Sequence, residues 1–426
     1  MALTAALRAH PAAAARAQVT SDTVRVARSE PHDLSTLLQS PQGSCPRTRQ
    51  PSFLSFWTAD GAVLNTNKYV GENGGPSAFS AFAIKWGMYS RGECWEDIAY
   101  GMPYGGVGFY AAEFFDIEQG HVGTPMSLFI FQGATLARVS PRMTFNYEWN
   151  LGLSFGWEPY DPFDTPLNIA IGSSVNAHIA FNFYFRWMAS QYLDLNFGLN
   201  LAHFSNGASR LPNAGFNLAA PMVELALNFN RNARASLYET CGPPPPFMRH
   251  VDHDISMTIS SRQTEFAAND QTGLPLPYID RKFKVLGLSY AMLFANDYKY
   301  KWGPTADLIY DESSNVTAWR EKLPGTDAFY DRVRLGPMGD RVSLGVGVRG
   351  ELTMMRYSIF ATMGWNAIWG NKDDTRLYQV LGLKAYLSQN LFGTFGIRAS
   401  HFSSAQYLYW SLGYTINGRN RGIKER

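Results

Sequence analysis

The stretch MTFNYEWNLGLSFGW, residues 143–157, decides the fold class of this chain. Every second side chain in it is large and apolar, and the side chains between them are polar or small. The apolar positions are Met143, Phe145, Tyr147, Trp149, Leu151, Leu153, Phe155 and Trp157. Successive side chains of a β-strand point to opposite faces, so this period of two predicts a strand with one apolar and one polar face. Residues 175–187, VNAHIAFNFYFRW, repeat the pattern.

These two strands are longer than those of most soluble sheets. Soluble strands usually have about five or six residues, whereas about 9 to 11 residues cross a bilayer at a tilt. The alternating stretches hold 15 and 13 residues, and each ends on a tryptophan, Trp157 or Trp187. Aromatic residues at strand ends are typical of the interfacial girdles of outer-membrane barrels. The pattern therefore predicts an all-β fold, an antiparallel transmembrane β-barrel.

Extending the alternation along the chain gives about sixteen strands, an even number as bacterial barrels have. They are expected near residues 54–66, 79–91, 105–115, 125–139, 142–157, 174–188, 191–204, 216–229, 252–263, 281–296, 301–310, 340–351, 355–369, 376–388, 392–403 and 405–416. Short turns near Ser140 and Ala189 alternate with longer connections, as at the two ends of such barrels. A single barrel of about sixteen strands is the leading expectation, because it needs only one closure.

A sequence repeat supports the alternative, two fused eight-stranded barrels. Residues 197–205, FGLNLAHFS, are echoed by residues 395–403, FGIRASHFS. Between them lie four consecutive prolines, 243–246, which cannot donate hydrogen bonds to a sheet. The expected regions are a disordered or processed segment (1–52), a first barrel half (53–230), a proline-rich connection (231–251), a second barrel half (252–417) and a basic tail (418–426).

The composition excludes several other classes of protein. Of 426 residues, 46% are hydrophobic, and the mean hydropathy is −0.20. This is too apolar for a disordered chain, and no run of about 18 apolar residues could form a membrane-spanning helix. The formal net charge of +2 gives no reason to expect a nucleic-acid partner. Cys45, Cys94 and Cys241 lack metal-site spacing, so we expect no metal and at most one disulfide, between Cys94 and Cys241.

A histidine and a serine continue the apolar face of residues 193–205. Leu199 and Leu201 are followed on the same parity by His203 and Ser205. This spacing places an imidazole beside a hydroxyl on the lipid-facing side, near the membrane rim. An imidazole can act as a general base and turn a serine into a nucleophile for acyl transfer. The alternative interpretation is two polar residues tolerated near the lipid headgroups.

The residues around this pair resemble the signature of the PagL-type family of outer-membrane lipid A 3-O-deacylases. The similar positions are His203, Phe204, Ser205, Asn206, Gly207, Pro212, Asn213 and Gly215, within a resemblance over residues 61–230. The resemblance implies Ser205 as nucleophile, His203 as general base, and an oxyanion hole at Asn206 and Gly207. It also implies a bacterial outer-membrane location, lipid A or another membrane lipid as substrate, and no cofactor. The oligomeric state is left open.

The chain departs from this family at the third member of the triad, where the family's glutamate falls on Asn217. An asparagine can orient an imidazole by accepting a hydrogen bond, but it does not stabilise the imidazolium by charge. Two hypotheses follow. The first is a serine esterase that removes an ester-linked acyl chain from lipid A or a related lipid, with Ser205, His203 and Asn217 as its site. The second is a catalytically inactive barrel that serves as a pore or scaffold.

Four further sequence motifs or residues are interpreted as structural features and not as functional sites. Residues 152–156 match G-x-S-x-G but lie inside a strand, not on a nucleophile turn. Glu224 lies on the parity of the lumen and cannot replace the missing carboxylate. Residues 250–254, HVDHD, place their histidines and aspartates on both faces, which disfavours a metal site. His401 and Ser403 repeat the pairing without the rest of the signature. Two other polar residues are expected in a lumen network: His178 and Arg186.

Overall fold

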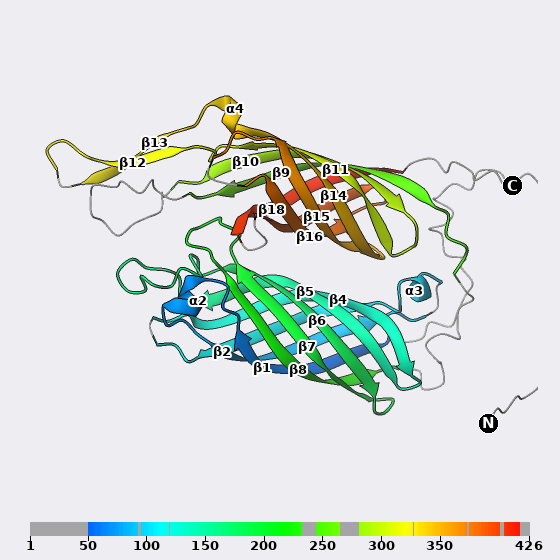
Figure 1. Ribbon diagram of the computed structural model, residues 1–426. Helices are drawn as coiled ribbons and strands as arrows, with labels where there is room; N and C mark the ends of the chain where they lie inside the picture. Colours follow the sequence, from blue (N-terminus) through cyan, green and yellow to red (C-terminus); the bar gives the residue numbers. More distant parts are fainter. Residues whose placement is uncertain are drawn as a thin grey trace, which may run out of the picture. The chain divides into compact units, whose positions relative to one another are not determined.

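The computed structural model describes residues 50–92, 95–118, 120–231, 244–264, 281–326, 328–372, 375–400 and 404–417 (Figure 1). This part of the chain forms two closed antiparallel barrels of eight strands each and a separate two-stranded sheet. The expected all-β barrel fold is confirmed. Each barrel is described by itself below.

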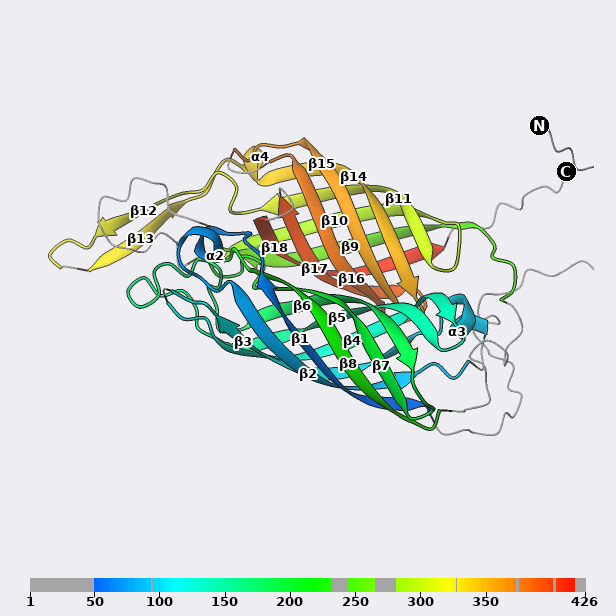
Figure 2. The same cartoon turned by 60° about the horizontal axis from the view of Figure 1, so that its bottom comes forward.

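The first barrel consists of eight consecutive strands. They are β1 (Ser52–Val63), β2 (Ala78–Tyr89), β3 (Tyr104–Phe115), β4 (Gly123–Ser140), β5 (Met143–Trp157), β6 (Asn176–Met188), β7 (Leu193–Ser205) and β8 (Phe216–Phe229). The barrel closes where β8 pairs with β1, from Ser52 opposite Phe229 to Val63 opposite Leu218. Figure 2 shows β7, β8, β1 and β2 as neighbours in its wall.

The second barrel also has eight strands. They are β9 (His250–Arg262), β10 (Phe283–Ala295), β11 (Tyr300–Asp311), β14 (Val342–Met354), β15 (Tyr357–Ile368), β16 (Leu377–Tyr386), β17 (Leu391–Ser400) and β18 (Ser404–Asn417). It closes where β18 pairs with β9, from Ser411 opposite Thr258 to Asn417 opposite Asp252. The connection from β11 to β14 carries the two-stranded sheet of β12 (Thr317–Lys322) and β13 (Phe329–Arg334), and helix α4 (Met338–Arg341).

The leading expectation of one sixteen-stranded barrel is wrong, and its alternative of two fused eight-stranded barrels is confirmed. Both closures join strands of the same half of the chain: β8 returns to β1, and β18 returns to β9. A single barrel would instead need pairing between β8 and β9 and between β18 and β1. The alternation of side chains specifies the faces of a strand but not its hydrogen-bonded neighbours, so it fits both closures equally well.

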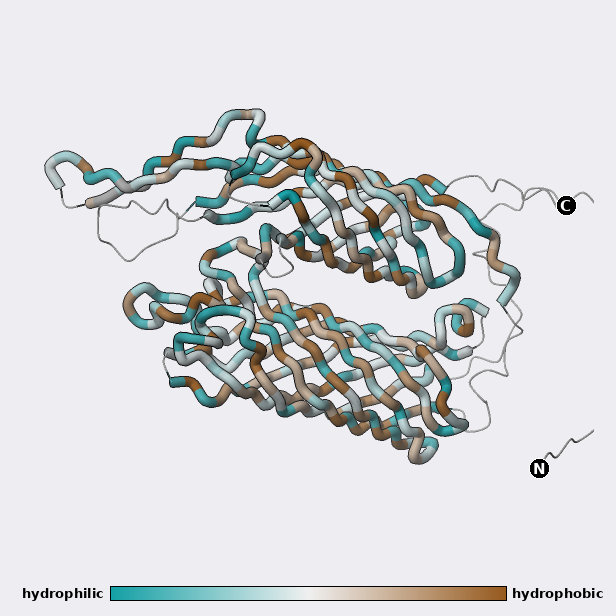
Figure 3. The backbone as a smooth tube through the Cα atoms, viewed as in Figure 1, coloured by the Kyte–Doolittle hydropathy of each residue, from teal (hydrophilic) through white to brown (hydrophobic). Residues whose placement is uncertain are grey.

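The side chains of the barrel strands alternate between an exposed outer face and a buried lumen. Along β8, Met222 and Glu224 are each 2% exposed, whereas Val223 and Leu225 are 49% and 40% exposed. Apolar and polar residues accordingly interleave along the strands in Figure 3. An apolar outer band around a polar interior is the arrangement of barrels that sit in a bilayer.

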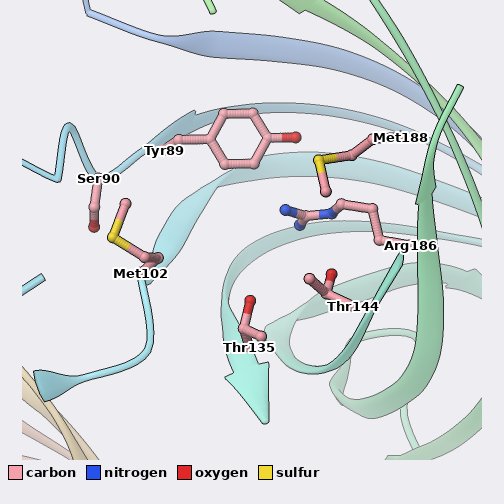
Figure 4. A pocket seen from close by; sticks show the side chains of 7 residues that line it. All are labelled: Tyr89, Ser90, Met102, Thr135, Thr144, Arg186 and Met188. Carbon is pink, nitrogen blue, oxygen red and sulfur yellow. The ribbon is translucent and has the colours of Figure 1, made fainter. Parts of the chain in front are cut away.

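Side chains fill the lumen of the first barrel. Lys85 Nζ lies 2.8 Å from a carboxylate oxygen of Glu148 and 2.9 Å from one of Glu224. One cavity in this barrel has a volume of about 30 Å³ (Figure 4) and is lined by Tyr89, Ser90, Met102, Thr135, Thr144, Arg186 and Met188. This volume has room for only one or two water molecules. In the second barrel, Lys384 similarly contacts the carboxylates of Asp254 and Glu351.

The connections at the two ends of the first barrel differ in length. Residues 141–142 join β4 to β5, and residues 189–192 join β6 to β7. The connections at the other end span residues 64–77, 116–122, 158–175 and 206–215. Outer-membrane barrels have short periplasmic turns and longer extracellular loops, so the second set marks the extracellular end. The β2–β3 connection with helix α3 (Trp95–Ala99) is a long exception at the periplasmic end.

The helices are short. Helix α2 (Lys68–Glu72) lies in the connection from β1 to β2, and α3 and α4 have five and four residues. Within the described ranges, no helix is both long and apolar enough to span a membrane.

Candidate active site

Strand β7 carries His203 and Ser205 on its outer face, at the extracellular end. The two residues share parity with Leu199 and Leu201, which are 60% and 47% exposed. Phe204, between them, is fully buried in the lumen, where its ring stacks on His178. The outward orientation expected for the pair is therefore what the strand adopts, although Ser205 itself is buried and His203 half-buried.

Ser205, His203 and Asn217 form a continuous hydrogen-bonded chain. The Oγ of Ser205 lies 2.8 Å from Nε2 of His203, and Nδ1 of His203 lies 2.7 Å from Oδ1 of Asn217. Strand pairing produces this geometry, because His203 on β7 stands directly opposite Asn217 on β8. The three residues that the sequence singled out are thus brought together at one site.

The hydrogen bonds of Asn217 define which nitrogen of His203 carries the proton. Oδ1 of Asn217 accepts from Nδ1–H, which leaves Nε2 free to accept the proton of the Ser205 hydroxyl. The other end of the amide, Nδ2, donates to Oγ1 of Thr66 at 2.7 Å. This is the tautomer that a general base next to a serine requires.

The loop 206–215 after β7 is held together by the side chain of Asn206. Its Nδ2 donates to Oγ of Ser173 at 3.0 Å and to the carbonyl oxygen of Arg210 at 2.8 Å. Its backbone N–H donates to Oδ1 of Asn213 at 2.8 Å. The donors of Asn206 are therefore already engaged within this loop and with Ser173 of the connection 158–175, which disfavours a role for this residue as an oxyanion donor.

Two other donors of this loop have no acceptor within the part of the chain that the structure describes. One is the buried Nδ2 of Asn213, and the other is the backbone N–H of Gly207, a residue with φ of 60°. Oδ1 of Asn213 binds the amide that directly follows Ser205, so the side-chain amide lies beside the serine. The N–H of Gly207 and Nδ2 of Asn213 are thus two donors near Ser205 that the described part of the chain leaves without an acceptor.

Gly215, the last residue of the signature, lies against both His203 and Ser205. A Cβ at this residue would lie 2.9 Å from Cε1 of His203 and 3.4 Å from Cβ of Ser205, and its φ is 75°. The backbone therefore passes directly over the histidine–serine pair, in a conformation that favours glycine. Its N–H donates to the carbonyl oxygen of Ala170, and its own carbonyl accepts from Nδ2 of Asn67.

The structure places the other polar signals of the first barrel in the lumen. Glu224 faces Lys85, on the opposite face of β8 from Asn217. His178 is buried and hydrogen-bonded to Ser127 at 2.8 Å. The guanidinium of Arg186 packs against the rings of Tyr89 and Tyr104. The serine of the G-x-S-x-G match, Ser154, is buried inside β5.

In the second barrel, the histidines and aspartates of residues 250–254 do not all meet at one point, although Nε2 of His250 lies 3.5 Å from a carboxylate oxygen of Asp252. Asp252 and Asp254 are buried beside Lys301 and Lys384, whereas His253 contacts the hydroxyl of Tyr290. Across the described ranges, no three His, Cys, Asp or Glu side chains are grouped to hold a metal ion. His401, Ser403 and the three cysteines lie outside the described residues.

These features define a class of protein. Closed antiparallel barrels with an apolar outer face, a polar interior and unequal ends are the bacterial outer-membrane barrels. The chain is a bacterial outer-membrane protein of this class, and its first barrel carries a Ser–His–Asn arrangement at the extracellular rim.

A comparison with known families gives a match in the second half of the chain. The model described as acyloxyacyl hydrolase, C-terminal domain, matches residues 252–418, which is the second barrel. This match supports membership of the PagL-type family, as the resemblance implied. The match lies outside residues 61–230, which carry the resemblance, and the signature of His203 and Ser205 is in the first barrel.

Solved outer-membrane proteins are similar to the chain only at low identity. The siderophore receptor PirA from Acinetobacter baumannii is 8% identical, with 87% of this chain and 69% of that chain covered and a TM-score of 0.26. The toluene transporter TbuX from Ralstonia pickettii is 9% identical, with 87% and 90% covered and a TM-score of 0.18. An outer membrane channel from Pseudomonas putida F1 is 10% identical, with 87% and 96% covered and a TM-score of 0.19. Scores this low carry no information on function. No curated protein matches the chain.

Proposed function

We propose that this protein is an outer-membrane serine esterase that removes an ester-linked acyl chain from lipid A or a related lipid. The observation that carries the proposal is the hydrogen-bonded chain from Ser205 through His203 to Asn217. It lies on the outer face of the barrel at the extracellular end, where a lipid of the outer leaflet meets the wall. A hydroxyl and an imidazole placed there have a lipid ester as their natural reaction partner.

The geometry suits acyl transfer through a covalent intermediate. Oγ of Ser205 attacks the ester carbonyl while Nε2 of His203 takes the hydroxyl proton. The tetrahedral intermediate then collapses, the ester C–O bond breaks, and His203 returns the proton to the leaving alkoxide. Water attacks the acyl-serine by the same proton transfers in reverse order and releases the fatty acid. No metal or cofactor takes part in these steps.

Donors near Ser205 are needed for the negative charge that develops on the carbonyl oxygen. We assign this role to the backbone N–H of Gly207 and to Nδ2 of Asn213, since neither is engaged elsewhere in the described chain. Asn206, the other residue implied by the family signature, supports the loop instead. Asn213 is thus added to the site, and Asn206 moves to a structural role.

The amide at residue 217 sets the expected rate. In serine proteases, exchanging the triad carboxylate for an amide lowers the rate by about 10⁴. There the amide leaves the histidine in the wrong tautomer, whereas here Asn217 accepts from Nδ1–H and preserves the useful one. The loss specific to this chain is the missing charge beside the imidazolium, so we expect a slow but genuine esterase.

The second candidate, an inactive barrel, divides into a pore and a scaffold. The filled lumen of the first barrel, with Lys85 held between two carboxylates, disfavours a pore. A scaffold role makes no use of the aligned Ser205 and His203. The esterase is therefore the function that the geometry supports best.

The test replaces Ser205→Ala and compares it with Ser209→Ala, a control in the same loop. The purified variants are incubated with purified lipopolysaccharide in detergent micelles, and the released hydroxy fatty acid is measured by mass spectrometry. We expect Ser205→Ala to abolish release, Ser209→Ala to retain it, and both proteins to stay heat-modifiable on gels as folded barrels. Equal release by both variants would reject the assignment of Ser205.

A further inference from the structure

Thr66 contacts the end of the Ser205–His203–Asn217 chain that lies farthest from the serine. It belongs to the connection between β1 and β2, 151 residues before Asn217 in the sequence. Nδ2 of Asn217 donates to Oγ1 of Thr66 at 2.7 Å, and Oγ1 lies 3.4 Å from the carbonyl oxygen of Leu64. With its own proton directed to Leu64, the hydroxyl of Thr66 acts as an acceptor toward Asn217.

The backbone holds Thr66 in this place. The N–H of Leu64 donates to the carbonyl oxygen of Asn217 at 2.8 Å, which extends the pairing of β1 with β8 by one residue. The N–H of Thr66 donates to the carbonyl oxygen of Leu64, also at 2.8 Å. Asn67 donates from Nδ2 to the carbonyl oxygen of Gly215 at 2.8 Å and caps α2 by accepting from the N–H of Val70.

We infer that Thr66 is a positioning residue that keeps the amide oxygen of Asn217 directed at His203. The inference rests on the proposed esterase function and deepens it. A carboxylate presents an oxygen in either orientation, whereas the two ends of an amide differ in hydrogen-bonding character. An asparagine in this place therefore needs a partner that distinguishes its NH₂ end from its oxygen, and an accepting hydroxyl is such a partner.

The reversed amide would disable the site. Its NH₂ group would then face Nδ1 of His203, which would have to become the accepting nitrogen. The proton of the imidazole would move to Nε2, the atom that lies 2.8 Å from Oγ of Ser205. A protonated Nε2 on a neutral imidazole has no lone pair to take the serine proton, so the base would be lost. Thr66 thus acts on the serine through two intervening residues.

The experiment is a cycle of variants of the full-length protein, with p-nitrophenyl laurate in detergent micelles as the substrate. Thr66→Val exchanges the hydroxyl for a methyl group of similar size, and Thr66→Ser retains the hydroxyl. Each is made with Asn217 and with Asn217→Asp, which places a carboxylate of the same length beside His203. We expect Asn217→Asp alone to raise kcat by less than the protease factor of about 10⁴, since that factor includes the loss of a tautomer that Asn217 already preserves.

With Asn217 present, Thr66→Val should lower kcat about three- to tenfold, the range that one hydrogen bond supplies. KM should stay constant, and Thr66→Ser should retain activity. In the Asn217→Asp background, Thr66→Val should change kcat by less than about twofold, because a carboxylate has no orientation to lose. An equal loss in both backgrounds, or a loss with Thr66→Ser as large as with Thr66→Val, would overturn the inference in favour of a structural role.

A second measurement does not depend on activity. Imidazole ¹⁵N chemical shifts of histidine-labelled protein distinguish the two neutral tautomers, and the signal of His203 is identified by its loss in His203→Gln. Thr66→Val should shift His203 from the Nδ1–H form toward a mixture, and Thr66→Ser should not. If Ser205→Ala left hydrolysis unchanged, the esterase proposal would fail, whereas an unshifted tautomer in Thr66→Val would refute the positioning role alone.

Discussion

The tightest constraint at the site belongs to Gly215, a residue without a side chain. Its φ is 75°, and a Cβ at this position would lie 2.9 Å from Cε1 of His203, which leaves no room for a methyl group. In Gly215→Ala, the clash is relieved by displacing either the loop or the imidazole, and either shift lengthens the proton path to Ser205. Because small misplacements of catalytic groups are costly, we expect hydrolysis to fall about 10- to 100-fold, measured as fatty acid released from lipopolysaccharide.

The control for this prediction is Gly325→Ala. Gly325 has nearly the same φ, 78°, but a Cβ there would have no neighbour within 4 Å. Gly325→Ala therefore introduces the backbone strain of an alanine at positive φ without a clash. Hydrolysis should stay within about twofold of the unsubstituted protein. Comparable losses in the two variants would show that backbone strain, not contact with His203, is responsible.

Individual site residues differed in how far the sequence could predict them. The parity of residues 193–205 was sufficient to place His203 and Ser205 outward, because side-chain alternation is a local property of a strand. Asn217 was found only through the family resemblance. Thr66 could not be found, since its contact with Asn217 exists only because β1 pairs with β8. The engagement of the Asn206 donors could not be predicted either, because hydrogen-bond partners within a loop depend on its conformation.

At the scale of the strands, the first barrel depends on the lysine that crosses its interior. Lys85 on β2 reaches Glu148 on β5 and Glu224 on β8, and all three side chains are at most 2% exposed. Lys85→Met would leave two carboxylates buried without their counter-ion. Removing one partner of a buried ion pair typically costs about 3–5 kcal/mol of unfolding free energy. We expect a lower urea unfolding midpoint in detergent micelles.

Two further variants test whether unpaired charge causes the loss of stability in Lys85→Met. Combining Lys85→Met with Glu148→Gln and Glu224→Gln removes the charges together and should recover most of the lost stability. Lys282→Met, at an exposed lysine, should leave the midpoint nearly unchanged. If the triple variant were no more stable than Lys85→Met, lost packing of the lysine stem would be the better explanation.

The barrel strands were largely predictable, because long stretches of strict alternation define both their existence and their faces. The hairpin of β12 and β13 was not expected within residues 311–339. Its strands have only six residues each, and TAWREK and FYDRVR place charged residues on both parities. Without one apolar face, such a segment has no periodic signal that separates it from a loop.

At the scale of the whole chain, the number of closures was beyond what periodicity can decide. Sixteen barrel strands can close once or twice, and the local pattern of each strand is the same in both cases. The observations that favoured two barrels were of another kind: the echo between residues 197–205 and 395–403, and the prolines at 243–246. A duplicated motif implies a duplicated structural unit more directly than strand counting does.

Whether the sixteen strands close into one barrel or two has a functional consequence that an experiment can test. A barrel of 16 to 18 strands encloses a water-filled channel, whereas the interior of an eight-stranded barrel is filled by side chains. In the first barrel, Lys85, Glu148 and Glu224 meet across the lumen, and the cavity near the periplasmic end has a volume of about 30 Å³. We therefore expect the purified full-length protein to give no stepwise conductance in planar bilayers in which a porin does. Discrete steps that persist in Ser205→Ala would instead favour a pore, and with it the hypothesis of a barrel that acts without catalysis.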